Sequence, residues 1–488
     1  MSQRAVGRAT WDQRQQAFVE RLGRESLSDL ETGTILALPS ATFPVAELCK
    51  ITAIQHYEER MLFVVLLLRR PRLRVVYATS LPIDPDIVDY YLGFLPDPED
   101  ARRRLRLVAV GDDGPQPLTE KLLERPDVVE QLRGAVEDPD SAYVLPFNVT
   151  AAEQQLSDAL GLPVYGPHPR LAQLGSKSGG RRVARQAGVA VLPGAEDLRS
   201  LEAVEGAIAA IKAVSPQAEA VVIKLNDGFS GQGNAIVELS GPTSPLAESH
   251  TTFCAGEESW PSFAAKIAQG GAIVEQLIRP EAMASPSVQL RISPVGTVEV
   301  VSTHDQILGG PDNQVYLGCR FPAHWDYRLA IQEAGVRVGR VLADDGVIGS
   351  FGIDFIIDRS DGEARIYLSE INLRMGGTTH PFWMARLATG GVYDTLTGEL
   401  VADGKPKSYV ATDNLKSEHL AGRRPGDLIR DIGKAGLAYD AGARTGATLH
   451  LLGALPGFGK MGVTCIADSP EAADKLYQEL VDTIQDRD

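Results

Sequence analysis

The sequence predicts a chain that combines α/β and α+β units in about three domains. Its 488 residues, 44% of them hydrophobic, can bury a large core but exceed the usual size of one domain. Apolar strand candidates alternate with helical segments through residues 34–166, a rhythm typical of a parallel, doubly wound sheet. Two strand candidates and a helix after residue 446 predict a small α+β domain at the end of the chain.

The first predicted domain ends near residues 161–170, a stretch rich in proline and glycine that we interpret as a hinge. The turn after its first strand contains no glycine, so the dinucleotide-binding fingerprint is missing and we do not expect bound NAD. A helical pattern from Val45 ends in the apolar run Met61–Leu68, which predicts one buried helix stopped at Pro71. The strand candidates of this domain are Ile35–Leu38, Leu73–Tyr77, Leu105–Val110 and Tyr143–Leu145.

The middle region is expected to mix helices and strands ahead of a hairpin near residue 350. Its apolar periodicity predicts helices over residues 177–187 and 196–213. Strands are predicted to end in Lys224, Glu275 and Val301. In the last region, strands over Gly446–Leu455 and Met461–Ala467 flank a predicted Pro-Gly-Phe-Gly turn, and a helix follows from Pro470.

Charge and cysteine usage narrow the class of protein. The 48 basic and 64 acidic residues give a formal charge of −16, which disfavours general attraction to nucleic acid or anionic membranes. The four cysteines are widely separated and show no spacing typical of zinc, redox or disulfide motifs. The first 24 residues lack the apolar core of a secretory signal, and residues 61–68 are too short to span a bilayer. We therefore expect a cytoplasmic protein.

A segment late in the middle region carries the most informative polar pattern. It predicts a β-hairpin with Asp354 on one arm and Glu370, Asn372 and Arg374 on one face of the other. With its turn at residues 361–362, antiparallel pairing sets Asp354 close to Glu370. Two facing carboxylates and an amide oxygen suit Mg²⁺ with bound phosphates. The alternative is the polar, solvated face of an ordinary hairpin.

Lys224 leads into a glycine-rich loop that reads N-D-G-F-S-G-Q-G-N. The backbone amides of such a loop can approach anionic oxygens, and a lysine beside it can reach the α- and β-phosphates of a nucleotide. The pattern is not a Walker A loop, in which the lysine follows the last glycine. A plain strand-to-turn connection would also fit. The candidate nucleotide-binding residues here are Lys224, Gly228, Ser230, Gly231 and Gly233.

Two further features could contact a nucleotide. Lys177 opens a helix, where a second cation could meet phosphates, although lysines at helix starts are usually just solvated. The strand edge formed by Glu275, Gln276, Leu277 and Ile278 could pair with adenine while its carboxylate takes the ribose hydroxyls. Ordinary edge strands share this composition.

Three residues are candidates for substrate contact. Arg291 and Arg374 are guanidinium forks suited to a carboxylate or a phosphate, and either could instead form a structural salt bridge. His380 follows a glycine-bearing loop beyond the metal strand, a natural place for substrate contact. A structural histidine is the equal alternative, because the neighbouring sequence offers no obvious metal partner.

Taken in order, these features resemble the ATP-grasp superfamily. More narrowly, S-F-G-I-D-F at Ser350, E-I-N-L-R-M-G-G-T-T-H-P at Glu370, and L-H-L-L-G-A-L-P with G-K-M-G-V-T-C between Leu449 and Cys465 look like the pheganomycin-type peptide ligases. The resemblance covers most of the chain. It implies a Rossmann-like pre-ATP-grasp domain over residues 1–170, an ATP-grasp core over 171–393 with a lid at about 188–273, and an α+β C-terminal domain over 394–488.

The resemblance also implies roles for individual residues. Lys177 and Lys224 would bind the α- and β-phosphates, the glycine loop would cover the triphosphate, and residues 275–278 would hold adenosine. Asp354, Glu370 and Asn372 would ligate magnesium, with two ions expected. Arg291 and Arg374 would contact the transferred phosphoryl group and the substrate carboxylate, with His380 on the acceptor side. One departure is Gly352, which stands where related D-alanine ligases often carry an arginine.

By the same resemblance, the chain would be an ATP-dependent carboxylate–amine ligase that forms an amide through an acyl phosphate. It would join an amino acid or modified amino acid to a peptide, and a homodimer is common among similar enzymes. The rivals are a carboxylase-like ATP-grasp enzyme and a non-catalytic ATP-binding module. An attached biotinyl carrier is disfavoured because no lysine lies in a Met-Lys-Met arrangement.

Overall fold

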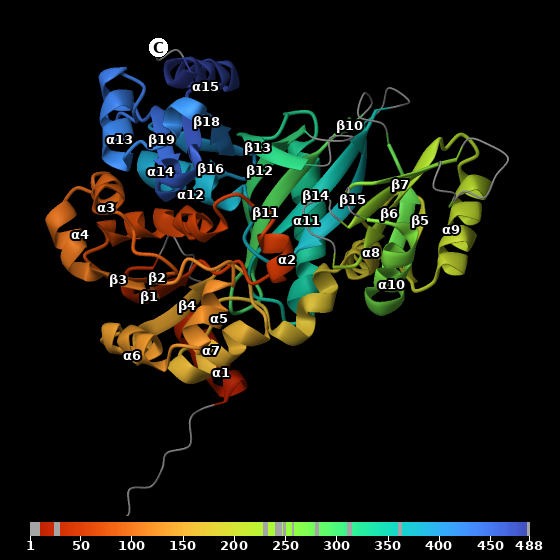
Figure 1. Cartoon of the computed structure of the whole chain (residues 1–488), viewed down its shortest axis with the longest axis horizontal. Coiled ribbons are helices and arrows are strands. Elements are labelled where there is room, and N and C mark those ends of the chain that lie inside the picture. Colours follow the sequence, from red (N-terminus) through yellow and green to blue (C-terminus); the bar gives the residue numbers. More distant parts are fainter. Residues whose placement is uncertain are drawn as a thin grey trace, which may run out of the picture.

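The computed structural model describes residues 10–23, 30–227, 233–239, 246, 250–255, 258–278, 283–309, 315–359 and 364–485. The N-terminal elements, red to orange in Figure 1, form one unit, and the C-terminal elements, in blue, lie directly above it. A central sheet joins these two units to a smaller one, drawn in yellow-green, that projects to the right. This mixed α/β and α+β architecture confirms the predicted fold class.

The N-terminal unit is a parallel sheet in the order β3-β2-β1-β4, covered on both faces. Alternate residues of β1 divide between two cores: Ile35 packs with η2 and α3, and Leu36 packs with α5, α6 and α7. All four predicted strands are present. The elements of this unit are α1 (Trp11–Leu22), β1 (Thr32–Leu38), α2 (Val45–Leu48), η2 (Ile54–Arg69), β2 (Arg72–Thr79), α3 (Pro85–Leu92), α4 (Pro98–Arg104), β3 (Leu105–Ala109), α5 (Leu118–Leu123), α6 (Pro126–Ala135), β4 (Ala142–Pro146) and α7 (Ala151–Leu160).

The single helix predicted from Val45 onward is wrong in one respect. The chain forms a short helix, α2, and then the separate, buried 3-10 helix η2. Ala53, just before η2, has a φ of 63°, and this left-handed backbone breaks the helical path between the two segments.

The projecting unit is an antiparallel sheet in the order β5-β9-β6-β7-β8, with α9 and α10 packed against it. The helix predicted over 196–213 begins later than expected, because residues up to Leu198 belong to β5 and the Ser200 side chain caps α9 by accepting from the Ala203 amide. The elements here are η4 (Pro169–Gly175), α8 (Lys177–Gln186), β5 (Gly194–Leu198), α9 (Leu201–Val214), β6 (Ala220–Leu225), β7 (Asn234–Glu238), β8 (Thr251–Phe253), α10 (Trp260–Gly270) and β9 (Ala272–Gln276).

The central sheet runs through the rest of the chain and, in the part that the structure describes, contains eleven strands. The predicted hairpin is its β14–β15 pair, and the C-terminal strands β18 and β20 extend the same sheet. The predicted Pro-Gly-Phe-Gly turn is largely a short helix, α14. The elements are β10 (Met283–Ala284), β11 (Pro286–Ile292), β12 (Val298–Gly309), β13 (Val315–Phe321), α11 (Arg328–Asp344), β14 (Gly349–Asp358), β15 (Arg365–Asn372), α12 (Thr379–Thr389), β16 (Val392–Asp394), β17 (Glu399–Ala402), β18 (Lys405–Lys416), α13 (Pro425–Lys434), β19 (Gly446–His450), α14 (Leu455–Phe458), β20 (Lys460–Ala467) and α15 (Pro470–Gln485).

Within the described part of the chain, no helix combines the length and the apolar character needed to cross a bilayer.

The start of β14 is pressed against the hinge that follows the N-terminal unit. Gly349 has a φ of 95°, and a Cβ there would lie 2.9 Å from Cα of Gly166 and 3.0 Å from the Tyr165 carbonyl oxygen. We predict that Gly349→Ala lowers the free energy of unfolding by about 2–4 kcal/mol, from left-handed strain plus overpacking. Gly346→Ala is the matched control: its φ is 86° but a Cβ there meets no atom within 4 Å, so only about 1–2 kcal/mol of strain applies. Equal losses in urea unfolding would contradict the proposed contact.

Candidate active site

A cavity of about 570 Å³ lies between the three units, a size typical of small-molecule sites. The projecting unit lines it through β6 and β9, the central sheet through β11–β15, and the N-terminal unit through the segments after β1 and β4. Ten of the residues predicted from the sequence line this cavity: Lys177, Lys224, Glu275, Gln276, Leu277, Ile278, Asp354, Glu370, Asn372 and Arg374.

The hairpin places its acidic residues as the alternation of side chains predicts. Asp354 on β14 pairs directly with Glu370 on β15, and a bulge follows between Asp354 and Phe355. The Asn372 amide donates to Oδ2 of Asp354 at 3.1 Å, and the Gln306 amide donates to Oδ1 at 2.8 Å. Two carboxylates and an amide therefore converge on one wall of the cavity.

The pKa values of the two carboxylates are shifted in opposite directions. Burial, followed by the neighbouring charge of Glu370, raises the pKa of Asp354 to about 7. Burial would also raise the pKa of Glu370, but Lys177, with help from Arg374 and Lys224, outweighs it and lowers that pKa. Facing carboxylates with this mutual repulsion are a donor set that a hard divalent cation would stabilise.

The two predicted phosphate-binding lysines are each tied to an acid on the cavity wall. Nζ of Lys177 lies 2.5 Å from Oε1 of Glu370, and Nζ of Lys224 lies 2.6 Å from Oε1 of Glu275. Their side chains are 8% and 12% exposed, so each ammonium group faces the cavity rather than bulk solvent. The two cations approach the same space from different elements, α8 and β6.

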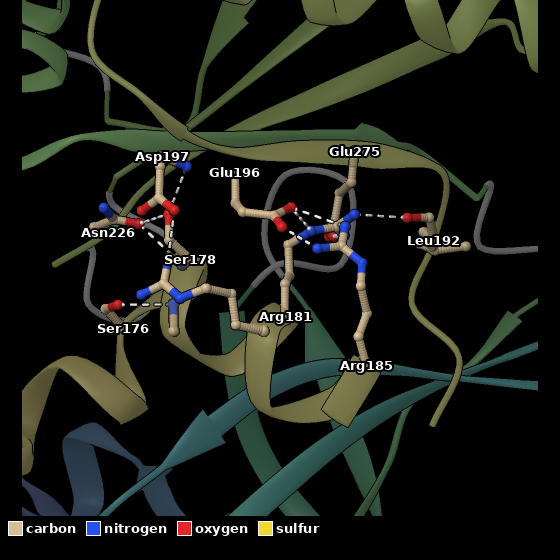
Figure 2. Close-up of polar contacts among 11 residues, drawn as sticks. Ser176, Ser178, Arg181, Arg185, Leu192, Glu196, Asp197, Asn226 and Glu275 are labelled. Carbon is tan, nitrogen blue, oxygen red and sulfur yellow. Dashed lines mark hydrogen bonds and ion pairs between the residues drawn. The ribbon is translucent and has the colours of Figure 1, made fainter. Parts of the chain in front are cut away.

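A buried arginine fixes the position of Glu275, as Figure 2 shows. Arg181 on α8 is 1% exposed; its Nη1 lies 3.1 Å from Oε2 of Glu275 and its Nη2 donates to the Leu192 carbonyl at 3.0 Å. Its Nε donates to Glu196, which also pairs with the more exposed Arg185. The Glu275 carboxylate, predicted to take the ribose hydroxyls, is therefore engaged by Arg181 and Lys224.

The first turn of α8 is docked onto the start of the glycine-rich loop. Oδ1 of Asn226 accepts from the amide and the hydroxyl of Ser178, at 3.0 and 2.7 Å. The Ser178 hydroxyl in turn accepts from the Asp197 amide at 3.0 Å. Of the loop residues predicted to cover phosphates, Gly228, Ser230 and Gly231 lie outside the described residues. Gly233 is described, and its carbonyl accepts from the Leu225 amide at 2.9 Å.

The predicted adenine-binding edge borders an apolar part of the cavity. Gln276, Leu277 and Ile278 line it together with Val222 and Met283. The backbone N–H of Gln276 donates to the Pro193 carbonyl, and the backbone N–H of Leu277 donates to the Ala220 carbonyl. The edge is thus fixed by its neighbours, and its side chains supply an apolar wall.

Of the three predicted substrate-contact residues, only Arg374 is among the described residues that line the cavity. Arg374 lines the cavity with its guanidinium 5.4 Å from the centre of the Phe43 ring. Arg291 is 2% exposed, pairs with Glu299 and lies near the Tyr165 ring, away from the described residues that line the cavity. His380 is also buried behind the cavity wall, against His450 and Asp413. Arg291 and His380 therefore do not lie with the other predicted site residues on the described cavity wall, and a direct substrate contact for either remains a prediction.

Sequence reasoning missed a group of cavity residues contributed by segments far apart in the chain. Arg60 lies 4.7 Å from the centre of the Tyr57 ring and pairs with Asp413, whose Oδ2 is 3.4 Å from its Nη1. Lys460 donates to the Tyr57 hydroxyl at 2.7 Å. Burial, then the nearby Lys416, lowers the pKa of Lys460 to about 8. Arg60 of η2, Lys416 of β18 and Lys460 of β20 form a cluster of cations on this part of the cavity wall. The cluster arises only because the fold brings η2, β18 and β20 together.

Gly352 stands at the position where related ligases often carry an arginine. It lies on β14 beside a glutamine of the adjacent strand. Gln289 on β11 is its strand partner, and a Cβ on residue 352 would lie 2.9 Å from the Gln289 amide nitrogen. Both residues line the cavity. The glycine thus makes room for an amide that occupies this part of the wall.

Models of three families match successive parts of the chain: a pre ATP-grasp domain at residues 75–162, an IQCH-like ATP-grasp at 245–395, and a PGM1 C-terminal domain at 427–480. An L-propargylglycine–L-glutamate ligase of Streptantibioticus cattleyicolor is 35% identical over 439 residues, covering 87% of this chain and 88% of that protein.

Solved structures share the fold at low sequence identity. An ADP complex of N5-carboxyaminoimidazole synthetase from Staphylococcus aureus aligns with a TM-score of 0.51 and 13% identity, over 92% of this chain and 98% of that one. A biotin carboxylase domain of Hydrogenobacter thermophilus 2-oxoglutarate carboxylase, solved with MgADP and bicarbonate, aligns with a TM-score of 0.55 and 14% identity, over 92% and 90%.

The buried Arg181–Glu275 pair yields a prediction. Arg181→Met leaves the Glu275 carboxylate buried with Lys224 as its remaining cation, so we expect the free energy of unfolding to fall by about 3–5 kcal/mol. Adding Glu275→Gln should recover part of this loss, because the uncompensated charge is then removed. Arg185→Met is the control; it removes the partly exposed partner of Glu196 and should cost under about 1 kcal/mol. Denaturant unfolding of the wild type and these three variants checks this, and an Arg181→Met protein as stable as Arg185→Met would contradict it.

Proposed function

The chain belongs to the pheganomycin-type ligases of the ATP-grasp superfamily, and from that membership we propose that it joins the carboxylate of one amino acid to the amine of a second amino acid or peptide, with cleavage of ATP to ADP. The observation that carries the proposal is the Asp354–Glu370–Asn372 wall with Lys177 paired to it and Lys224 lining the same cavity. Facing acids with flanking cations suit a triphosphate and its metal, and the adjoining Arg374 suits an acid.

The boundaries of the functional units form part of the proposal. We assign residues 1–170 to a pre-ATP-grasp domain, 171–393 to the ATP-grasp core and 394–488 to the C-terminal domain. The projecting sheet β5–β9 fits a lid at about 188–273, since α8 links it to the core through Arg181 and Ser178. Closure of such a lid would exclude water from a reactive acyl phosphate.

The acidic wall fits magnesium by the chemistry of its donors. Asp354, Glu370 and Asn372 would hold the metal, and the pKa of Asp354 is raised first by burial and then by repulsion from Glu370, both of which a bound cation would offset. Bound Mg²⁺ supplies charge neutralisation and alignment of phosphate oxygens. We propose two ions, because the wall offers more oxygen donors than one ion takes when phosphates complete its shell.

The protein's own groups position the reactants and stabilise charge. Lys177 and Lys224 lie where they can pair with phosphate oxygens in exchange for Glu370 and Glu275. Arg374, the cation beside the metal wall, can hold the carboxylate that attacks the terminal phosphorus and the acyl phosphate that results. The amine then attacks the acyl carbon and releases phosphate. No protein nucleophile is needed.

The other end of the cavity fits an acidic or zwitterionic amino acid. Four cations line it, namely Lys50, Arg60, Lys416 and Lys460, against the acids Glu47 and Asp413. The Streptantibioticus relative is named for two amino acids, one of which, glutamate, carries an additional carboxylate. A cation-rich end selects for anionic substrate groups by electrostatic complementarity.

The first functional prediction separates a ligase from a binding module. Glu370→Gln removes a metal ligand and the partner of Lys177, so we expect kcat to fall by about 100-fold or more while ATP affinity falls far less. Glu130→Gln, an exposed change on α6, should leave both unchanged. ADP release by the wild type should require both a carboxylate substrate and Mg²⁺, with amide product only when amine is present. ADP release with bicarbonate alone would instead support a carboxylase.

A second prediction concerns pH at the cation-rich end. Lys460 faces Tyr57 and Arg60 of η2 and Lys416 and Asp413 of β18, and its pKa of about 8 means that it is charged below that pH and neutral above it. We expect KM for the acid substrate to rise above pH 8, by up to about tenfold per pH unit. Lys460→Arg, which stays charged, should flatten this rise. Identical profiles for both proteins would refute a role of the Lys460 charge in binding.

A further inference from the structure

Two histidines and a carboxylate converge beside the cavity, apart from the groups assigned to ATP and magnesium. His380 is the second residue of α12, Asp413 lies on β18 and His450 ends β19. Their exposed fractions are 5%, 6% and 5%. Three segments distant in sequence thus bring polar side chains to one buried point.

The atoms that meet there are all electron-pair donors. Nε2 of His380 lies 3.0 Å from Nε2 of His450 and 3.0 Å from Oδ1 of Asp413, and Nε2 of His450 lies 2.8 Å from the same oxygen. The rings are inclined by 68°, so the nitrogen atoms converge while the rings do not stack. The second oxygen of Asp413 faces Arg60, which leaves Oδ1 for the cluster.

Protons cannot satisfy all three of these contacts. With both Nε2 atoms protonated, each can donate to Oδ1, but two N–H groups then face each other across 3.0 Å. With one protonated, the other nitrogen turns a lone pair toward the carboxylate oxygen at hydrogen-bond distance. With Asp413 ionised, each arrangement therefore leaves one close contact repulsive in a buried place, where such a contact is costly.

A metal ion satisfies all three at once. Imidazole nitrogen and carboxylate oxygen bind zinc at about 2.0–2.2 Å, and the centre of so small a triangle is within that reach of each atom. With bonds of this length, the ion would lie off the plane of the three atoms.

The strand next to His450 carries a glycine where a side chain would collide with the imidazole. Gly462 on β20 is the strand partner of His450, and a Cβ there would lie 2.1 Å from Nε2 of that histidine. The imidazole therefore occupies space that any other residue at 462 would fill. Asp413 also lines the cavity, so an ion bound to it would lie at the cavity wall.

We propose that His380, Asp413 and His450 bind a divalent transition metal, Zn²⁺ foremost, through two Nε2 atoms and one carboxylate oxygen. Two imidazoles with one carboxylate favour zinc and its first-row neighbours, whereas the all-oxygen wall of Asp354, Glu370 and Asn372 favours magnesium. The site joins α12 to β18 and β19, and it adds positive charge next to Arg60 at the amino-acid end of the cavity.

The test is the metal content of the full-length protein. After growth with added zinc and dialysis against a buffer that contains Mg²⁺ but no transition metal, elemental analysis should find about one zinc per chain. Asp413→Asn and His450→Gln should each weaken zinc binding about tenfold or more, measured by titration against a chelator of known affinity. His304→Gln is the matched control, because His304 is equally buried but bonds to Tyr409 instead.

Two further measurements keep the proposal decidable if a ligand variant fails to fold. Gly462→Ala keeps all three ligands and displaces the His450 ring, so it should weaken zinc binding as well. Co²⁺ added to stripped wild-type protein should give visible absorption bands that zinc abolishes and excess Mg²⁺ does not. Wild-type protein that neither retains zinc nor develops these bands would overturn the proposal and leave the cluster a hydrogen-bonded network. Equal zinc content in Asp413→Asn, His450→Gln and wild type would also overturn it.

Discussion

The antiparallel register of β14 and β15 is the constraint on which the site depends. It sets Asp354 opposite Glu370 on neighbouring strands, where their like charges repel and burial raises the cost of ionising either. A sheet would not keep such a pair without compensation, and the surroundings supply it: Lys177 at the start of α8, Arg374 just beyond β15, and the Gln306 and Asn372 amides. The positions of these groups follow from the need to balance two fixed carboxylates.

The same logic links the projecting unit to the core. Glu275 on β9 forms ion pairs with Lys224 on β6 and with the buried Arg181 on α8. These two ion pairs connect α8, β9 and β6. Lys177 opens the same helix and pairs with Glu370 on β15. One short helix therefore positions cations toward both walls of the cavity. Any movement of the projecting unit would then be coupled through α8 to Lys177 and Lys224.

Much of the fold and half of the site could be predicted because they are encoded locally. Alternation along a strand predicted the Asp354–Glu370 pairing, and the strand candidates of the N-terminal sheet were confirmed. The helix over 196–213 was predicted too long because a serine cap, not apolar periodicity, decides where α9 begins. For Arg291 the sequence left a substrate contact and a structural salt bridge open, because a guanidinium suits both, and its pairing with Glu299 depends on the next strand.

The residues that escaped prediction are those whose meaning is set by tertiary contact. Arg60 lies in an apolar helix, Asp413 in a long strand and Lys460 at the start of another, and none belongs to a local motif. Only the pairing of β18 with β20, and the packing of η2 against them, makes them neighbours. The cation-rich end of the cavity therefore draws on segments from both ends of the chain. Under the proposed function, the choice of substrates and the chemistry of the nucleotide would then rest on different units.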